Sequence, residues 1–241
     1  MRDQRILVFG QKGQLARSFQ KVLPQALYLG SDSCDLFQEG SATSAIHAHK
    51  PSVVINCSAY TAVDMAEEEI NLAYQLNQKA PEEIASACCQ VEASLIHFST
   101  DYVFDGQKAQ PYTELDATQP LNIYGASKLE GEQAVLESNC QGVVFRTSWV
   151  YSPYGKNFPL TMLRLAFEKE DLGVVDDQTG SPTYAPHLAK AIKQLLENKL
   201  KMEGLYHLSG AGSCSWYEFA SYIFSEVRER FNRDLKVKAL R

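Results

Sequence analysis

Short apolar segments alternate with helical segments through the first 150 residues, and this alternation limits the fold more than any other feature of the sequence. Between two of the apolar segments, Leu15 and Phe19 recur at the spacing of a helix face. The predicted strands are rich in β-forming residues and lie at positions 5–9, 26–29, 53–55, 94–98 and 142–145. Strands that alternate with helices are typical of a parallel sheet with helices on both faces. We therefore predict an α/β fold with a doubly wound parallel sheet in residues 1–150.

The regular alternation ends near residue 150. Residues 158–169 and 215–230 are predicted to be helices, and residues 205–208 a strand. We predict that residues 151–241 form mainly a smaller C-terminal lobe, from which a strand at 172–176 returns to the large sheet.

The composition is that of a globular protein and argues against several kinds of partner. A formal charge of −6 without a local basic patch disfavours nucleic acid. No apolar run fits a membrane span or a signal peptide, so we expect no membrane partner and a cytoplasmic protein. The six cysteines form no C-x-x-C pair, and His47 and His49 lie on different faces of a helix, so we expect no metal site.

A glycine-containing loop joins the first predicted strand to the first predicted helix. Gly10 permits a tight turn, and Gly13 lets the backbone approach a phosphate without a Cβ in the way. Free N–H groups at the start of a helix bind the pyrophosphate of a dinucleotide at this position. An ordinary strand-to-helix turn also explains two glycines, but the place of the loop at the start of the chain favours a cofactor.

The residue that distinguishes NAD from NADP is missing from its usual place. An acidic side chain at the end of the second strand normally binds the ribose 2′-hydroxyl of NAD. Here Gly30 occupies that position, and Asp32 follows two residues later. Ser31 and Ser33 tolerate a 2′-phosphate, but no arginine stands nearby to require one. We therefore expect NADPH or NADH, with neither form favoured.

A tyrosine, a lysine and a threonine are predicted to meet beyond the carboxyl end of the fourth strand. Tyr124 and Lys128 are four residues apart on a helix, so their side chains share a face. A neighbouring ammonium group lowers the pKa of a phenol, and such a tyrosine can protonate a carbonyl oxygen. Taken alone, this pair is better explained as a surface feature. Thr100 changes that, because it directly follows the fourth strand, where ligands bind in open α/β sheets.

Six stretches of the sequence resemble the dTDP-4-dehydrorhamnose reductase family of extended short-chain dehydrogenases. Ser-Thr-Asp-Tyr-Val-Phe combined with Arg-Thr-Ser-Trp-Val-Tyr is specific to this family, and the resemblance covers nearly the whole chain. It implies a Rossmann-like dinucleotide-binding domain in residues 1–150 and a substrate-binding lobe in residues 151–241. The matching stretches are residues 53–64, 97–106, 120–131, 146–151, 177–183 and 204–208.

The resemblance also implies a reaction. Hydride passes from NADH or NADPH to the C4 ketone of dTDP-4-dehydro-β-L-rhamnose, and the product is dTDP-L-rhamnose. Carried over by position, Tyr124 is the proton donor, Lys128 is its partner and ribose anchor, and Thr100 donates a hydrogen bond to the carbonyl. The implied partners are a dTDP-sugar and at most a second copy of the chain, as a homodimer.

The resemblance further implies two sets of binding residues. The residues expected to contact the cofactor are Gly10, Gln11, Lys12, Gly13, Gln14, Leu15, Asp35, Leu36, Cys57, Ala59, Tyr60, Thr61, Ser99, Tyr124 and Lys128. The residues expected to contact the substrate are Thr100, Asp101, Trp149, Gln178 and Thr183. Core packing for Trp149, a turn for Asp35 and a surface position for Asn77, which the family uses to support the site, are the simpler alternatives.

The sequence departs from the family in several places. Ala16 replaces the third glycine of the phosphate loop, a tolerable change, and Ser18 replaces an acidic metal ligand of some relatives. Family members continue for some tens of residues past this sequence, through an Arg-Pro segment of the substrate lobe. We therefore expect a complete cofactor site and a doubtful substrate affinity. The alternatives are a reductase of another sugar nucleotide, and a binding protein like the regulatory subunit of methionine adenosyltransferase.

Overall fold

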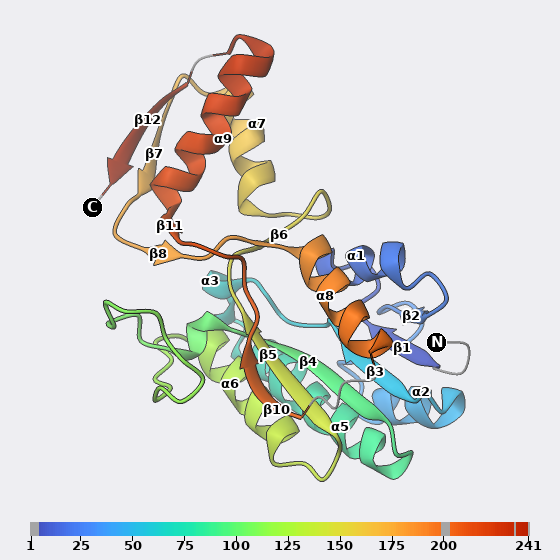
Figure 1. Cartoon of the computed structure of the whole chain (residues 1–241). Helices are drawn as coiled ribbons and strands as arrows, with labels where there is room; N and C mark the ends of the chain where they lie inside the picture. The colour runs from blue at the N-terminus through green and yellow to red at the C-terminus, as the bar shows by residue number, and fades with distance from the viewer. Residues whose placement is uncertain (1–4, 199–202, 234, 241) are drawn as a thin grey trace.

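The computed structural model describes residues 5–198, 203–233 and 235–240. Its larger part is built on a six-stranded parallel sheet with the order β10-β5-β4-β3-β1-β2 (Figure 1). The strands of this sheet are β1 (Ile6–Phe9), β2 (Leu27–Leu29), β3 (Val53–Asn56), β4 (Ser94–Thr100), β5 (Gly142–Thr147) and β10 (Gly204–His207).

Helices cover both faces of this sheet. β1 shows why its sequence is a continuous apolar run: Ile6 and Val8 belong to the core on one face, and Leu7 and Phe9 to the core on the other. The predicted doubly wound α/β fold is therefore confirmed. The helices are α1 (Gln14–Val22) and α8 (Ala185–Glu197) on one face, and α2 (Ser41–His49), α5 (Ala80–Gln90) and α6 (Ile123–Leu136) on the other.

A smaller lobe stands above the carboxyl ends of the strands (Figure 1). Its core holds Met162, Phe224 and Val227, which are buried between two helices and a two-stranded parallel sheet. Its elements are α7 (Phe158–Glu168), α9 (Trp216–Phe231), β7 (Asp171–Val175) and β12 (Lys236–Leu240), with the short pairs β6 (Val150–Tyr151) and β9 (Thr183–Tyr184), and β8 (Thr179–Gly180) and β11 (Cys214–Ser215).

The prediction that residues 172–176 return to the large sheet is wrong. β7 pairs instead with β12 in the smaller lobe, and the place beside β5 is taken by β10. Only Val174 of β7 is fully buried, so this strand has the pattern of a half-covered sheet. The side chain of Leu240 lies over Gly173, where a Cβ would come within 2.8 Å of it.

Short helical segments follow β3 and β4 and lead into the edge of the sheet where ligands bind. After β3 these are α3 (Val63–Ala66), α4 (Ile70–Tyr74) and a π-helical turn over Gln75–Lys79; after β4 there is one 3₁₀ turn over Asp101–Val103. A π-helical turn often marks a functional site. In the part of the chain that the structure describes, no helix has the length and apolar character needed to cross a membrane.

Candidate active site

The loop after β1 is shaped to hold a phosphate. Gly10 has a φ of +89°, and a Cβ on it would lie 2.9 Å from backbone atoms of Cys57 and Ser58. Only glycine fits such a position without strain. No side chain caps the start of α1 at Gly13, so the N–H groups of its first turn are left for an anion. The residues present therefore fit the pyrophosphate of a dinucleotide.

A cavity of about 230 Å³ lies against this loop. It extends to the segment after β2, as expected for the adenosine half of a dinucleotide. The predicted cofactor residues that line it are Gly10, Gln11, Lys12, Gly13, Asp35, Leu36, Cys57 and Ala59. Ser31, which was predicted to lie beside the ribose, also lines it. Phe37, Ser58 and Leu76 line it too and were not predicted, since no local pattern marks a wall built from separate loops.

The other predicted cofactor residues lie outside this cavity, and the side chains of two of them, Gln14 and Leu15, have partners within the protein. The side-chain oxygen of Gln14 accepts hydrogen bonds from Ser152 at 3.0 Å and from Asn157 at 2.8 Å. Gln14 thus joins α1 to the start of the smaller lobe, and Leu15 packs into the core under the sheet. The pyrophosphate predicted here would therefore meet the backbone N–H groups of the first turn of α1.

Asn77 supports the exit of β3 and is not a surface residue. It is fully buried in the π-helical turn, where its Oδ1 accepts from Tyr60 N at 2.8 Å. Its Nδ2 donates to Tyr60 O and to Ser127 Oγ, each at 3.0 Å. Asn77 therefore fixes the backbone of a predicted cofactor residue to α6, next to Lys128. Thr61, by contrast, is exposed.

Thr100 and Tyr124 meet at the end of β4, as predicted. Close packing of α6 on the 3₁₀ turn brings them together, since a Cβ on Gly125 would lie 2.2 Å from the Tyr102 carbonyl oxygen. Burial raises the pKa of Tyr124, Thr100 lowers it through a side-chain hydrogen bond, and the Asp101 carboxylate raises it further. The prediction that a cation lowers this pKa is therefore wrong. The phenol stays protonated at neutral pH, as a proton donor requires.

Lys128 is buried on α6, one turn after Tyr124. Its ammonium group donates to the Phe98 carbonyl oxygen at 2.7 Å, and only 2% of the residue is exposed. Burial lowers the pKa of Lys128 to about 8, against the opposing effect of Glu132. Ser99, also predicted to contact the cofactor, is buried, and its hydroxyl has no hydrogen-bond partner among the described residues.

Asp101 lies beside Thr100, which donates to its Oδ1 at 3.1 Å. Burial raises the pKa of Asp101 to about 6, although hydrogen bonds from Thr100 and from the backbone oppose the shift. The folded state therefore binds the proton more tightly than the unfolded state. As the pH rises from 4 to 6, the carboxyl group of Asp101 ionises and the stability of the protein falls. At pH 7 the folded protein bears the whole free-energy cost of burying this charge.

We expect Asp101→Asn to raise the free energy of unfolding at pH 7 by about 1–2 kcal/mol, because the amide carries no charge to desolvate. The gain should disappear near pH 4, as measured by thermal unfolding across this range. Asp105→Asn is the matched control of opposite sign, since a hydrogen bond from Tyr112 lowers the pKa of Asp105. An equal gain for Asp101→Asn at both pH values would contradict this account.

Backbone conformation and ring packing fix the position of Trp149 at the start of the smaller lobe. Its φ is +46°, an unusual value for a bulky residue, and its ring stacks on Trp216 with centroids 3.4 Å apart. The ring also covers Gly180, where a Cβ would lie 2.4 Å from it. Trp149 is only partly buried. Strained backbone at the junction of two lobes fits a residue that is positioned for a ligand.

The two remaining predicted substrate residues have different environments. Gln178 is exposed in the turn between β7 and β8. Thr183 is 1% exposed, donates to the Ser181 carbonyl oxygen at 3.0 Å and accepts from Gly210 N at 3.0 Å. Thr183 therefore joins two segments of the chain, and its hydroxyl has two partners within the protein.

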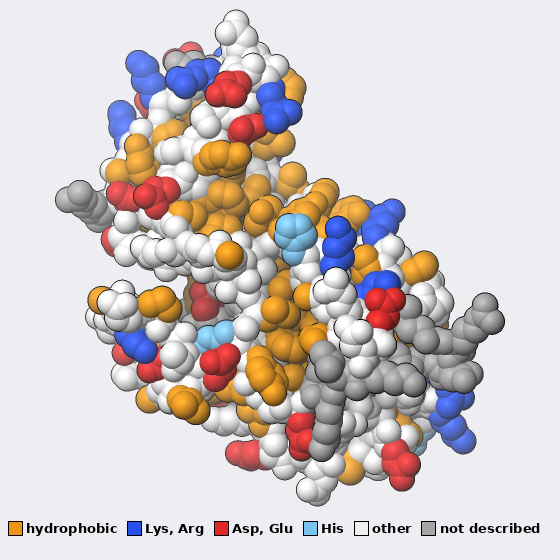
Figure 2. Space-filling view, viewed as in Figure 1, with side chains coloured by type: hydrophobic (Ala, Val, Ile, Leu, Met, Phe, Trp, Pro, Cys, Tyr) orange, Lys and Arg blue, Asp and Glu red, His pale blue; other side chains and the backbone are white. Residues whose placement is uncertain are grey.

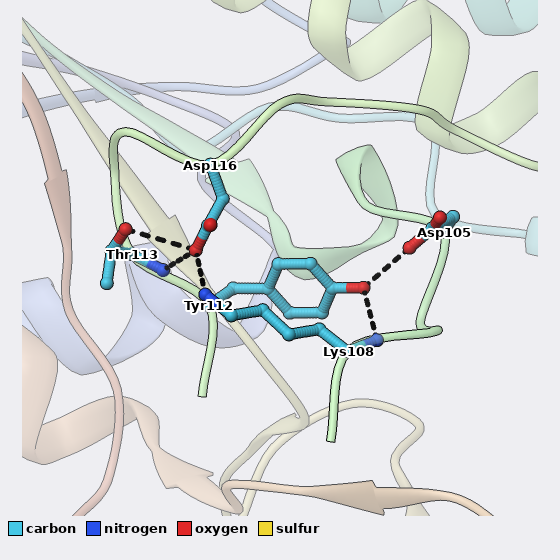
Figure 3. A network of polar contacts seen from close by, with 5 residues as sticks. All are labelled: Asp105, Lys108, Tyr112, Thr113 and Asp116. Carbon is cyan, nitrogen blue, oxygen red and sulfur yellow. Dashed lines mark hydrogen bonds and ion pairs between the residues drawn. The ribbon is translucent and has the colours of Figure 1, made fainter. Parts of the chain in front are cut away.

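A second cavity, of about 360 Å³, opens between the two lobes, where Figure 2 shows the surface hollowed. Asp101 lines it together with the loop at 104–112, β8 and the end of β10. Figure 3 shows how this loop is fixed: Asp116 accepts from Lys108 and Thr113, and the Tyr112 hydroxyl donates to Asp105 at 2.6 Å. No periodic pattern in the sequence marks this segment, because its order depends on these polar contacts.

The sheet, the phosphate loop and the polar set at the end of β4 together define an oxidoreductase-type dinucleotide-binding protein of the short-chain dehydrogenase class. The family model for the RmlD substrate binding domain matches residues 4–240. The chain belongs to this family.

Relatives and solved structures agree with this assignment. The dTDP-4-dehydrorhamnose reductase of Escherichia coli K12 is 43% identical over 235 residues, which are 93% of this chain and 78% of that protein. The enzyme of Aggregatibacter actinomycetemcomitans is 42% identical, over 92% and 79%. The crystal structure of dTDP-4-dehydrorhamnose reductase from Bacillus anthracis in complex with NADP superposes with a TM-score of 0.91 at 40% identity, covering 98% of this chain and 84% of that one.

Proposed function

We propose that this protein reduces the C4 ketone of dTDP-4-dehydro-β-L-rhamnose to dTDP-L-rhamnose, with NADPH or NADH as the hydride donor. The observation that carries the proposal is the meeting of Tyr124 and Thr100 at the carboxyl end of β4, where their hydroxyl groups are hydrogen-bonded. The names of its relatives support the choice of sugar.

The chain's own residues supply the proton and the orientation. A bound nicotinamide supplies hydride to the ketone carbon. Tyr124 gives its proton to the ketone oxygen, and solvent later restores that proton. Thr100 orients the phenol. Its hydroxyl, which donates to Asp101 Oδ1 in the free protein, turns to donate to the same ketone oxygen when the sugar binds. Lys128, whose ammonium group is fixed by the Phe98 carbonyl at 2.7 Å, anchors the ribose.

The sugar nucleotide is proposed to occupy the cavity between the lobes, with Asp101 and Trp149 beside the sugar and Gln178 beyond it. Cytoplasm is the proposed compartment, since all six cysteines are free. A homodimer is the proposed assembly, and light scattering of the purified chain measures it.

The experiment that tests the function follows cofactor absorbance after enzymatically generated dTDP-4-dehydrorhamnose is added to the purified chain. We expect steady oxidation that requires both protein and sugar, with dTDP-L-rhamnose as the product. Cofactor binding without oxidation would contradict the proposal and favour a binding role for the same fold.

A further inference from the structure

The residue at the end of β2, Gly30, has no side chain that could hydrogen-bond the ribose 2′-hydroxyl of NADH. Gly30 is buried there, its N–H donates to Ser33 Oγ at 3.1 Å, and its carbonyl accepts from the same hydroxyl at 3.1 Å. A carboxylate in this position would bind a ribose 2′-hydroxyl and repel a 2′-phosphate. Gly30 does neither, so neighbouring side chains must determine the preference for NADPH or NADH.

Lys12 is the one cationic side chain among the described residues that line the adenosine cavity. It comes from the phosphate loop, and Ser31 lines the same cavity directly after the end of β2. The one carboxylate in the lining is Asp35, whose Oδ1 accepts from Phe37 N at 3.1 Å and so belongs to its own turn. The cavity thus offers one positive charge next to the place of the ribose.

The charge of Lys12 is held by Asp32. The Nζ of Lys12 lies 2.5 Å from Oδ2 of Asp32, and the two side chains are 68% and 77% exposed. An ion pair that is this exposed contributes little to stability, so little is lost when it breaks. A phosphate carries more charge and more acceptor oxygens than a carboxylate, and it forms stronger hydrogen bonds with an ammonium group.

From this geometry we infer that Lys12 binds the 2′-phosphate of NADPH and makes the protein prefer NADPH to NADH, with Asp32 competing for Lys12 in the free protein. The inference rests on the proposed function only in requiring a dinucleotide at the phosphate loop. Asp32 then acts as a weak competitor of the phosphate and not as the reader of an NADH ribose.

Binding of oxidised cofactors to the full chain, measured by calorimetry without any sugar, tests this assignment. Lys12→Met should weaken NADP⁺ about tenfold or more, because a charge-assisted hydrogen bond is lost, and leave NAD⁺ nearly unchanged. Lys21→Met is the matched control, since it removes the same charge from the exposed end of α1. It should change neither affinity.

Asp32→Asn provides the converse test. It should strengthen NADP⁺ several-fold, because the carboxylate no longer competes for Lys12, with a smaller effect on NAD⁺. Comparing 2′,5′-ADP with 5′-AMP isolates the 2′-phosphate and should reproduce the pattern of the two cofactors.

Three results would overturn the inference. Equal weakening of both cofactors by Lys12→Met would place the ammonium group on the pyrophosphate. No weakening would mean that Lys12 contacts neither cofactor, and weaker NADP⁺ binding to Asp32→Asn would remove the competitor role. If selective binding is found but the sugar is not reduced, the proposed function fails while this inference stands.

Discussion

Tyr124→Phe is expected to lower turnover of the sugar-nucleotide ketone by about 10²–10⁴-fold, the usual contribution of a positioned general acid. The phenylalanine ring keeps the edge-to-face contact with Tyr102, whose centroid lies 5.4 Å away. Only the hydroxyl bound to Thr100 is lost. The adenosine cavity does not involve Tyr124, so cofactor affinity should stay nearly the same.

Tyr102→Phe is the matched control, because it removes a phenolic hydroxyl from the neighbouring ring, which is 38% exposed. It should leave turnover close to that of the original protein. Turnover is measured from cofactor oxidation, and affinity from a separate titration. If Tyr124→Phe kept full turnover, the proton would have to come from another group, and the assignment at the end of β4 would be wrong.

The layers of the fold could be predicted because each central strand contains a short apolar run in the sequence. Residues 6–9 are buried alternately against the two faces, which requires four apolar side chains in succession. Gly10 was equally readable, since its positive φ in a tight turn favours glycine. These constraints act over a few residues and therefore appear in the local sequence.

Features that depend on distant partners could not be predicted. The pairing of β7 with β12 joins segments about sixty residues apart, and nothing in either strand specifies the other. The Gln14 side chain is used by Ser152 and Asn157, well over a hundred residues away. The ion pair between Lys12 and Asp32 likewise required the folded loops.

The direction of the pKa shift at Tyr124 could not be predicted from the sequence either. Spacing on a helix suggested that Lys128 would stabilise a phenolate. In the folded protein, burial dominates and Asp101 acts in the same direction, while the Lys128 ammonium group is directed to the Phe98 carbonyl. Burial is a property of the whole fold, so a motif of two residues identifies the proton donor without fixing its protonation.

Gly13→Val should weaken cofactor binding about a hundredfold or more, which corresponds to about 3 kcal/mol. Gly13 has a φ of −71°, which any residue adopts, and a Cβ there would lie 3.2 Å from the Gly10 carbonyl oxygen. The backbone can therefore accept a side chain with a small shift. The branched methyl groups would occupy the space over the first turn of α1, where a pyrophosphate must approach the free N–H groups.

Gly13→Ala separates the effect of the Cβ from that of the branched methyl groups. It adds the Cβ alone and should weaken cofactor binding less than Gly13→Val does. Thermal unfolding of both variants separates a blocked site from a damaged fold, and melting temperatures near that of the original protein are expected. Unchanged affinity of Gly13→Val for NADP⁺ and NAD⁺ would place the pyrophosphate elsewhere. The free N–H groups of α1 would then need another ligand, and the cavity beside them would no longer mark the adenosine half of a dinucleotide.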